Sequence, residues 1–403
     1  MNASSASSAM LPPSASSRPA LEAAERRTLG VLAAVGVATA ALGAVLAPQQ
    51  LWAAWLLVSY YVIGLGLAGG CFVAIQYTTG SSWCVAIRRV PEAMAGTLPL
   101  GIVMLALLLI LHPQLYPWMA GGVGATEGGS AAFRQAWLSR PFFLARAAVY
   151  AAIWILFTTA LRRRSLRQDA DGDPRWTRAN VRWSAAFLAF FGATFTLASV
   201  DWIMSLEPRW YSTIFGAYNF AGLFLSGLAA IILLAIWLER RGPLQHVLTG
   251  DHLHDLGKLL FAFSTFWMYL WFSQYMLIWY TDIPEETAYF VRRVHGIWLV
   301  LLLANILCNW LVPFFVLLRR DTKRRRDVLA AVAAIVLAGR WLDVYLMIAP
   351  GVASGGLGIG LWAIGLTAGG AGAFGLALAR TLRGAPAVPV ADPQLAASLQ
   401  YEH

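Results

Sequence analysis

The chain has 403 residues, of which 59% are hydrophobic and only 12% are charged. Soluble globular proteins carry about a quarter charged residues, so this composition excludes an ordinary water-soluble domain and predicts a membrane protein. The net charge of +10 does not indicate nucleic-acid binding, because the arginines cluster between apolar segments, as they do in the loops of membrane proteins.

Two tails enclose the apolar part of the chain. Residues 1–20 are rich in Ser, Ala and Pro, and we expect a disordered cytoplasmic tail over residues 1–27. The first long apolar run follows this tail and is long enough to stay in the membrane, so a cleavable signal peptide is not predicted. Residues 384–403 are expected to form a second, loose tail, which leaves residues 28–383 as the membrane domain.

A membrane-spanning helix needs about 20 mostly apolar residues. Within the hydrocarbon layer each backbone amide must find a partner inside its own segment, so such a run is expected to be helical. The sequence contains runs of this kind at residues 28–47, 52–76, 93–112, 141–161, 179–200, 213–238, 257–280, 294–318, 327–348 and 357–379. We therefore expect an all-α integral membrane protein with about ten transmembrane helices.

Basic residues indicate how these helices are oriented. Arg and Lys cluster before the first run and after the second, fourth, sixth, eighth and tenth runs. If ten helices alternate in direction, all of these clusters lie on one side of the membrane. Loops rich in Arg and Lys stay in the cytoplasm, so both termini are predicted to be cytoplasmic.

Motifs for soluble-type catalysis and for metal binding are missing from the sequence. The three cysteines form no CxxC pair, and no Walker, dinucleotide-binding or HExxH pattern occurs. A b-type haem in a membrane needs axial ligands, usually His, on facing helices. Only His112 and His295 lie near suitable places, and both are at helix ends, so we expect neither haem nor an iron–sulfur cluster.

The most informative polar stretch leads into the seventh run. Ionisable groups in a membrane are costly and are therefore functional candidates. Helical spacing places Lys258, Thr265, Tyr269 and Ser273 on one face, and such a seam can hold water and conduct protons. The proton-path candidates of this stretch are His254, Asp255, Lys258, Thr265, Tyr269, Ser273 and Gln274. The structural alternative is that Lys258 extends to the interface while the hydroxyls bond neighbouring helices.

The ninth run carries two further proton-path candidates, Arg340 and Asp343. Their spacing of three residues lets them pair on one helical face, and a paired charge in hydrocarbon costs far less than a lone one. A proton relay and a purely structural pair are both consistent with this pattern. Asn305 and Asn309 in the eighth run can line the same interior or join neighbouring helices.

A third group of ionisable residues lies toward the outer ends of the predicted helices. A quinone headgroup needs a few hydrogen-bond donors and titratable groups beside an apolar cleft that is open to lipid. The quinone-binding candidates are His112, Arg146, Arg292 and His295, and the outer proton-path candidates are Asp201 and Glu207. The alternative is a solvated surface that binds a periplasmic partner.

Several segments between residues 195 and 295 resemble a known family. The longest are 199–216 (SVDWIMSLEPRWYSTIFG), 254–267 (HDLGKLLFAFSTFW) and 271–280 (WFSQYMLIWY), with the shorter 218–222 (YNFAG) and 283–286 (IPEE) beside them. They are similar to the second NrfD-like membrane subunit of bacterial alternative complex III, a quinol:cytochrome c oxidoreductase. That subunit is often described as its second quinone-binding subunit, and the ten-helix layout extends the resemblance to the rest of the chain.

The resemblance implies a polysulfide-reductase-like fold, with two four-helix bundles and two peripheral helices, in the bacterial inner membrane. It implies as partners a sister NrfD-like subunit, an iron–sulfur subunit, c-type cytochrome subunits and small membrane subunits, with a terminal oxidase as a further candidate. The sister subunit is the stronger candidate for quinol oxidation. This chain would contribute a proton-conducting path, quinone contact and assembly, without stand-alone activity. Menaquinone or another quinone and phospholipids are its expected ligands.

Two other classes of function stay open. Secondary transporters contain broken helices near the membrane centre, and the glycine-rich stretch 351–375 would allow one, although close helix packing explains glycine equally well. The other alternative is a scaffold that only anchors peripheral subunits. Neutral substitution of Lys258 or Asp343 separates a proton-conducting subunit of a redox complex from a scaffold. Only the proton-conducting subunit is expected to lose proton pumping while assembly stays intact.

Overall fold

The computed structural model describes residues 17–121, 130–352 and 359–401 of the chain. These ranges contain helices and connecting segments, and no β-strand. The long continuous helices are α2 (Ala23–Leu46), α3 (Pro48–Thr79), α8 (Arg140–Asp171), α9 (Arg175–Trp202), α10 (Phe215–Arg240), α11 (Gly250–Thr281), α16 (Arg326–Val352) and α17 (Ile359–Arg383).

Two further long segments are interrupted. Helix α4 (Arg89–Ala95) leads into α5 (Leu98–Leu111), and α13 (Ile297–Ile306) continues through a π-helical turn, η5 (Leu307–Leu311), into α14 (Val312–Leu317). The short connecting elements are η2 (Val85–Ile87), η3 (Pro113–Leu115), α6 (Pro117–Gly121), α7 (Ser130–Trp137), η4 (Met204–Leu206), α12 (Pro284–Arg293), α15 (Arg320–Arg324) and α18 (Leu395–Leu399).

Within the described ranges, nine helical segments are long and apolar enough to cross a membrane. They coincide with nine of the runs predicted from the sequence, so the chain is a multi-pass, all-α membrane protein. The remaining run corresponds to α11, which has 32 residues and is therefore about 48 Å long. Its Trp, Tyr, Ser and Gln side chains make it less apolar than the other nine, although its length is sufficient.

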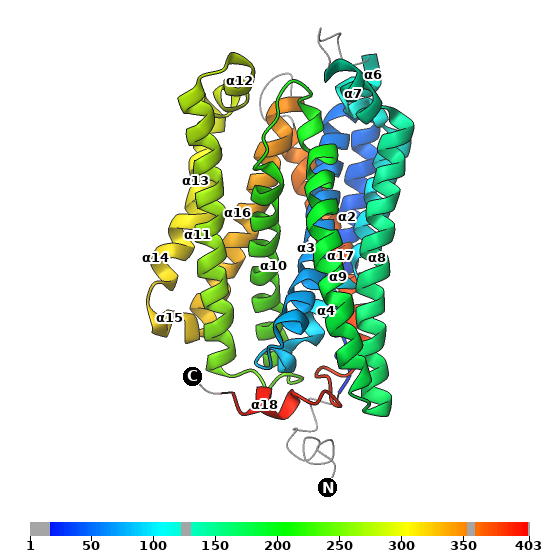
Figure 1. The fold of residues 1–403 in the computed structure, drawn as a ribbon, viewed down its shortest axis with the longest axis vertical. Helices are drawn as coiled ribbons and strands as arrows, with labels where there is room; N and C mark the ends of the chain where they lie inside the picture. The colour runs from blue at the N-terminus through cyan, green and yellow to red at the C-terminus, as the bar shows by residue number, and fades with distance from the viewer. Residues whose placement is uncertain (1–16, 122–129, 353–358, 402–403) are drawn as a thin grey trace.

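The two ends of the described chain lie at the same end of the helix bundle (Figure 1). Arg241, just after α10, pairs with Glu22 and Glu25 at the start of α2, and the amide of Ala387 donates a hydrogen bond to the carbonyl of Ser17 (3.1 Å). An odd number of crossings would place the ends on opposite sides. Figure 1 shows α11 beside α10 through the height of the bundle, so we infer that α11 is the tenth crossing.

The core of the bundle lies around α3 and α10. In the most apolar 18 residues of these helices 89% and 83% are buried, against 11% in α2. Helix α2 packs on α17, where Gly36 and Gly369 meet backbone to backbone and Gly365 and Gly372 also face α2. The described glycines of the stretch 351–375 thus include a set that serves close helix packing. Residues 353–358 of that stretch lie outside the described ranges.

Helix α8 departs most from its predicted bounds. The apolar run was predicted to end at residue 161, but the helix continues to Asp171. The added turns hold Arg162, Arg163, Arg164 and Arg167, and arginine is a good helix former. The apolar run therefore marks the part of the helix suited to lipid, whereas the helix itself extends beyond it.

The segment that follows α17 is not the loose tail expected from the sequence. Ala387, Val388 and Leu395 are almost completely buried against the end of the bundle. The Ser398 hydroxyl donates to the carbonyl of Trp83 (2.7 Å) and accepts from the amide of Ala86 (3.0 Å). A few apolar anchors in a mostly small and polar segment are enough to hold it, and composition alone does not reveal this.

Candidate functional site

A pair of opposite charges lies deep inside the bundle. Arg340 and Asp343 in α16 form an ion pair one helical turn apart, as their spacing predicted. Each residue is only 2% exposed, so neither side chain reaches lipid or solvent. Lone charges at this depth are expensive, and even a pair persists only when its remaining hydrogen-bonding groups find partners.

The Asp343 carboxylate receives hydrogen bonds from four elements of the bundle. Its Oδ1 accepts from the Tyr218 hydroxyl in α10 and from Asn305 Nδ2 in α13 (3.1 Å). Its Oδ2 accepts from Trp267 Nε1 in α11 (3.2 Å) and from Arg340 of its own helix. These donors fill the acceptor positions of an ionised carboxylate, which is the form that balances Arg340.

The Arg340 guanidinium is held equally closely. Its Nη2 donates to Asn219 Oδ1 in α10 (3.1 Å), and the same oxygen accepts from the Tyr60 hydroxyl in α3 (3.1 Å). Gly222, one turn further along α10, leaves the space that the guanidinium fills. Helices α3, α10 and α16 therefore meet around one cation, and a glycine makes that contact possible.

We expect Gly222→Ala to disturb this pair directly. A methyl group at position 222 would lie 2.5 Å from Arg340 Nη1 and 2.6 Å from its Cζ, so the guanidinium would have to move. Overpacking of this kind costs about 1–3 kcal/mol, which thermal unfolding in detergent can measure. The control is Gly192→Ala in α9, where the added methyl meets nothing within 4 Å. An equal effect at both positions would contradict the packing described.

The π-helical turn η5 completes the site. Pro313 has no N–H and so cannot bond the carbonyl of Asn309, which instead accepts from the Ser264 hydroxyl in α11 (2.7 Å). The side chain of Asn309 donates to Asn305 Oδ1 (2.7 Å), and Asn305 in turn donates to Asp343. The proline thus produces an irregular turn, and the freed carbonyl joins two helices beside the charged pair.

A small cavity leads from Asp343 toward the end of the bundle opposite the chain ends. Its volume is about 20 Å³, enough for one water molecule. Asp343 and Asn305 line it together with Gln274 and Arg293. All four are buried polar residues, so a water molecule here would find hydrogen-bond partners on several sides.

Arg293 links this cavity to a carboxylate near the surface. It donates from Nη2 to Glu207 Oε1 (2.8 Å) and from Nε to the carbonyl of Leu346 (2.9 Å). The second oxygen of Glu207 pairs with the exposed Arg292 (3.2 Å). A chain of polar groups therefore runs from Asp343 through the cavity and Arg293 to Glu207 and the bundle surface. Of the candidates predicted near the outer helix ends, Glu207 and Arg292 belong to this series of polar groups.

The polar face that was predicted on α11 is not the face that the bundle buries. Tyr269 is 63% exposed, the side chain of Lys258 is 46% exposed, and Thr265 bonds the carbonyl of Phe261 in its own helix (3.1 Å). The buried face is rotated by about one residue and carries Ser264, Trp267 and Gln274. Of the seven seam candidates, only Gln274 lines the cavity beside Asp343. Ser273 is only partly buried and lies off this face.

His254, Asp255 and Lys258 lie near the start of α11, at the same end of the bundle as the chain ends. Asp255 pairs with Lys258 and accepts a hydrogen bond from the Tyr401 hydroxyl (2.5 Å). Asp255 precedes Trp267 by 12 residues, about 18 Å along the helix. Leu256 and Leu260 on the buried face lie between them, so this cluster is separate from Asp343.

The quinone-binding candidates do not converge. Arg146 in α8 is buried in a bidentate pair with Asp201 (2.9 and 2.8 Å), which also accepts from Tyr150 (3.0 Å). His112 stacks on Trp52 with ring centres 5.7 Å apart, and His295 is exposed between α12 and α13. Figure 1 shows α12 and α8 on opposite sides of the bundle. Arg146 and Arg292 therefore do not lie together, and Asp201 is held in the ion pair with Arg146. Quinone contact by any of the four candidates stays a prediction.

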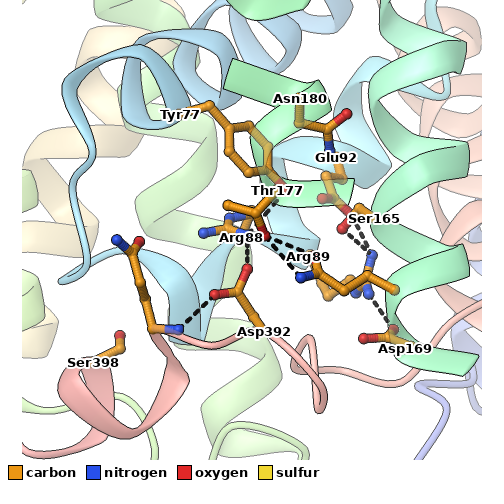
Figure 2. A network of polar contacts seen from close by, with 12 residues as sticks. Tyr77, Arg88, Arg89, Glu92, Ser165, Asp169, Thr177, Asn180, Asp392 and Ser398 are labelled. Atoms are coloured by element: carbon orange, nitrogen blue, oxygen red, sulfur yellow. Dashed lines mark hydrogen bonds and ion pairs between the residues drawn. The ribbon is translucent and has the colours of Figure 1, made fainter. Parts of the chain in front are cut away.

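Sequence reasoning missed a second set of buried ion pairs at the end with the chain ends (Figure 2). Arg88 pairs with Asp392 of the C-terminal segment and donates to the Tyr77 hydroxyl (3.0 Å). Beside it, Arg89 pairs with Glu92 and with Asp169 of α8. Arg88 and Arg89 had been interpreted only as a topology signal, although both are 3% exposed. The nearby Glu92, three residues after Arg89, was the available clue.

Within the described ranges, no group of three or more His, Cys, Asp or Glu side chains is placed to hold a metal ion. Comparison of the sequence with known protein families and with curated proteins finds no match. The geometry around Asp343 is therefore the observation from which a function has to be argued.

Proposed function

We propose that this chain is the second NrfD-like membrane subunit of a respiratory quinol:electron-acceptor oxidoreductase of the alternative complex III type. Its ten helices would form two four-helix bundles with α2 and α17 as the peripheral pair. The basic end, with both termini, would face the cytoplasm across the bacterial inner membrane. In this proposal Asp343 is the proton-carrying group, and quinol oxidation belongs to the sister subunit.

The observation that carries this proposal is the convergence of the family-like segments on one buried carboxylate. Segment 218–222 supplies Tyr218, and segment 254–267 supplies Trp267, both of which donate to Asp343. Segment 271–280 supplies Gln274 of the adjoining cavity, and segment 199–216 supplies Glu207 at its outer end. Residues far apart in sequence thus line one polar route, which passes through the cavity between Asp343 and Arg293.

The part of the route between Asp343 and Glu207 is the part that supports proton transfer. A water in the cavity would contact Asp343, which can accept a proton, and Arg293, which only donates hydrogen bonds and holds Glu207 in place. Protonation of Asp343 would remove the charge that balances Arg340. Quinol oxidation in a neighbouring subunit would shift this balance through a new nearby charge, and no electron needs to pass through the chain.

Co-purification tests the proposal. A tagged copy of the chain is purified in mild detergent from its native membranes. We expect haem absorption and iron–sulfur resonances to accompany it, with the haem on separate polypeptides. The control is a tagged multi-pass protein of another class from the same membranes. Purification of the chain alone, free of redox centres under conditions that preserve other respiratory complexes, would refute the proposal.

A further inference from the structure

The outer face of α8 combines apolar and basic residues in one recess. The recess has a volume of about 410 Å³. Its lining residues all belong to α8 and are Ile155, Leu156, Thr159, Ala160, Arg163, Arg164 and Arg167. The sequence Leu156, Ala160, Arg163, Arg167 follows helical spacing along a single face, so apolar surface passes directly into positive charge.

The arginines of this recess lack counter-charges within the described part of the chain. The nearby acidic residues are committed elsewhere, because Asp169 pairs with Arg89 while Asp171 and Asp173 pair with Arg175. Arg164 lies over the ring of Trp183 in α9 (4.1 Å), and its buried Nη1 has no hydrogen-bond partner. An oxygen of an anionic ligand could supply the acceptor that this buried guanidinium nitrogen lacks.

The position of the recess selects the kind of anion. The neighbouring Arg162 donates to the carbonyl of Thr381 near the end of α17 (2.7 Å), so the arginines lie at the end of the bundle that holds the chain ends. Leu156 is 58% exposed, and only a third of the most apolar part of α8 is buried, so this face is suited to contact lipid. A free phosphate would use the arginines but leave the apolar half of the recess empty.

We propose that this recess binds one anionic phospholipid. Its phosphate would contact Arg163, Arg164 and Arg167, and an acyl chain would lie along Leu156 and Ala160. The charges fit an anionic headgroup such as that of phosphatidylglycerol or cardiolipin, whereas zwitterionic phosphatidylcholine would gain little from three arginines. The site is independent of the proton route, because none of its residues lines the cavity beside Asp343.

The test compares two double variants of the full-length chain, purified with the subunits that accompany it. Arg163→Gln/Arg167→Gln removes charge from the recess. Arg319→Gln/Arg325→Gln removes the same charge at exposed positions around α15, at the same end of the bundle. Phosphatidylglycerol is titrated in phosphatidylcholine nanodiscs, and retained lipid is counted by native mass spectrometry. At about 1 kcal/mol for each arginine, we expect about thirty-fold weaker phosphatidylglycerol retention in the first variant and unchanged retention in the second.

Two controls identify the ligand. Inorganic phosphate alone should not protect the chain against thermal unfolding, and a photo-crosslinker at Ala160 should label lipid. Equal retention in both variants, equal binding of phosphatidylcholine, protection by free phosphate, or crosslinking to a protein subunit would each overturn the proposal. A variant that fails to fold is recognised by its unfolding curve, and Arg164→Gln alone then serves in its place.

Discussion

Asp343→Ala is expected to lower the stability of the chain by about 3–5 kcal/mol. The substitution leaves Arg340 buried without its counter-charge, and breaking a buried pair from one side is far more costly than removing both charges. The double variant Arg340→Met/Asp343→Leu should therefore recover much of the loss. Thermal unfolding in detergent measures both variants, and Asp327→Ala, whose side chain is 79% exposed near the start of α16, is the matched control.

The same variants separate a proton relay from a structural pair. In proteoliposomes that contain the whole complex, the double variant should assemble and transfer electrons but translocate no protons, because the carboxylate is gone. Asp327→Ala should behave like the unmodified protein. Proton translocation by a stable double variant would assign Arg340 and Asp343 a purely structural role. An unchanged stability of Asp343→Ala would contradict the burial of the pair.

The helical layout could be predicted from the sequence because it depends on local properties. Apolar runs of about 20 residues identify helices, and basic clusters show how they alternate. The pairing of Arg340 with Asp343 was also predictable, since both partners belong to one helical turn. The partners from other helices were not, because Tyr218 is 125 residues from Asp343 and Asn305 is 38 residues away.

Helix α11 shows why a sequence pattern can misidentify the buried face of a membrane helix. The predicted seam followed the hydroxyl-bearing residues Thr265 and Tyr269, on the assumption that polar side chains face the interior. Thr265 is only partly buried and satisfies its hydroxyl within its own helix, so it needs no partner from a neighbouring helix. The buried face instead carries Trp267, whose ring fills space while its N–H reaches Asp343. Side-chain size and polarity therefore determine together which face of the helix is buried, and the spacing of polar residues alone does not give their relative contributions.

Deletion of residues 385–403 is expected to open the end of the bundle where the chain ends meet. Ser398 of this segment accepts a hydrogen bond from the amide of Ala86 in η2. The segment also supplies Asp392, the acidic partner of Arg88, which is 304 residues away in the sequence. Cys84, directly before η2, is completely buried, and burial raises the pKa of its thiol from 9.0 to about 12. Because only the thiolate reacts with maleimide, the intact protein should resist labelling at pH 8.

The deletion should bring the Cys84 pKa back toward 9.0 and raise the thiolate fraction at pH 8 by about a thousandfold, since three pKa units separate the two states. Labelling of Cys84 is followed in a Cys71→Ala/Cys308→Ala background, which leaves one thiol in the chain. Removal of residues 402–403 alone is the control and should change nothing. Asp392→Ala should give an intermediate rate, because it removes the Arg88 pair while Ser398 still holds the segment. Equal labelling of the intact and deleted chains would show that the C-terminal segment does not cover this end of the bundle.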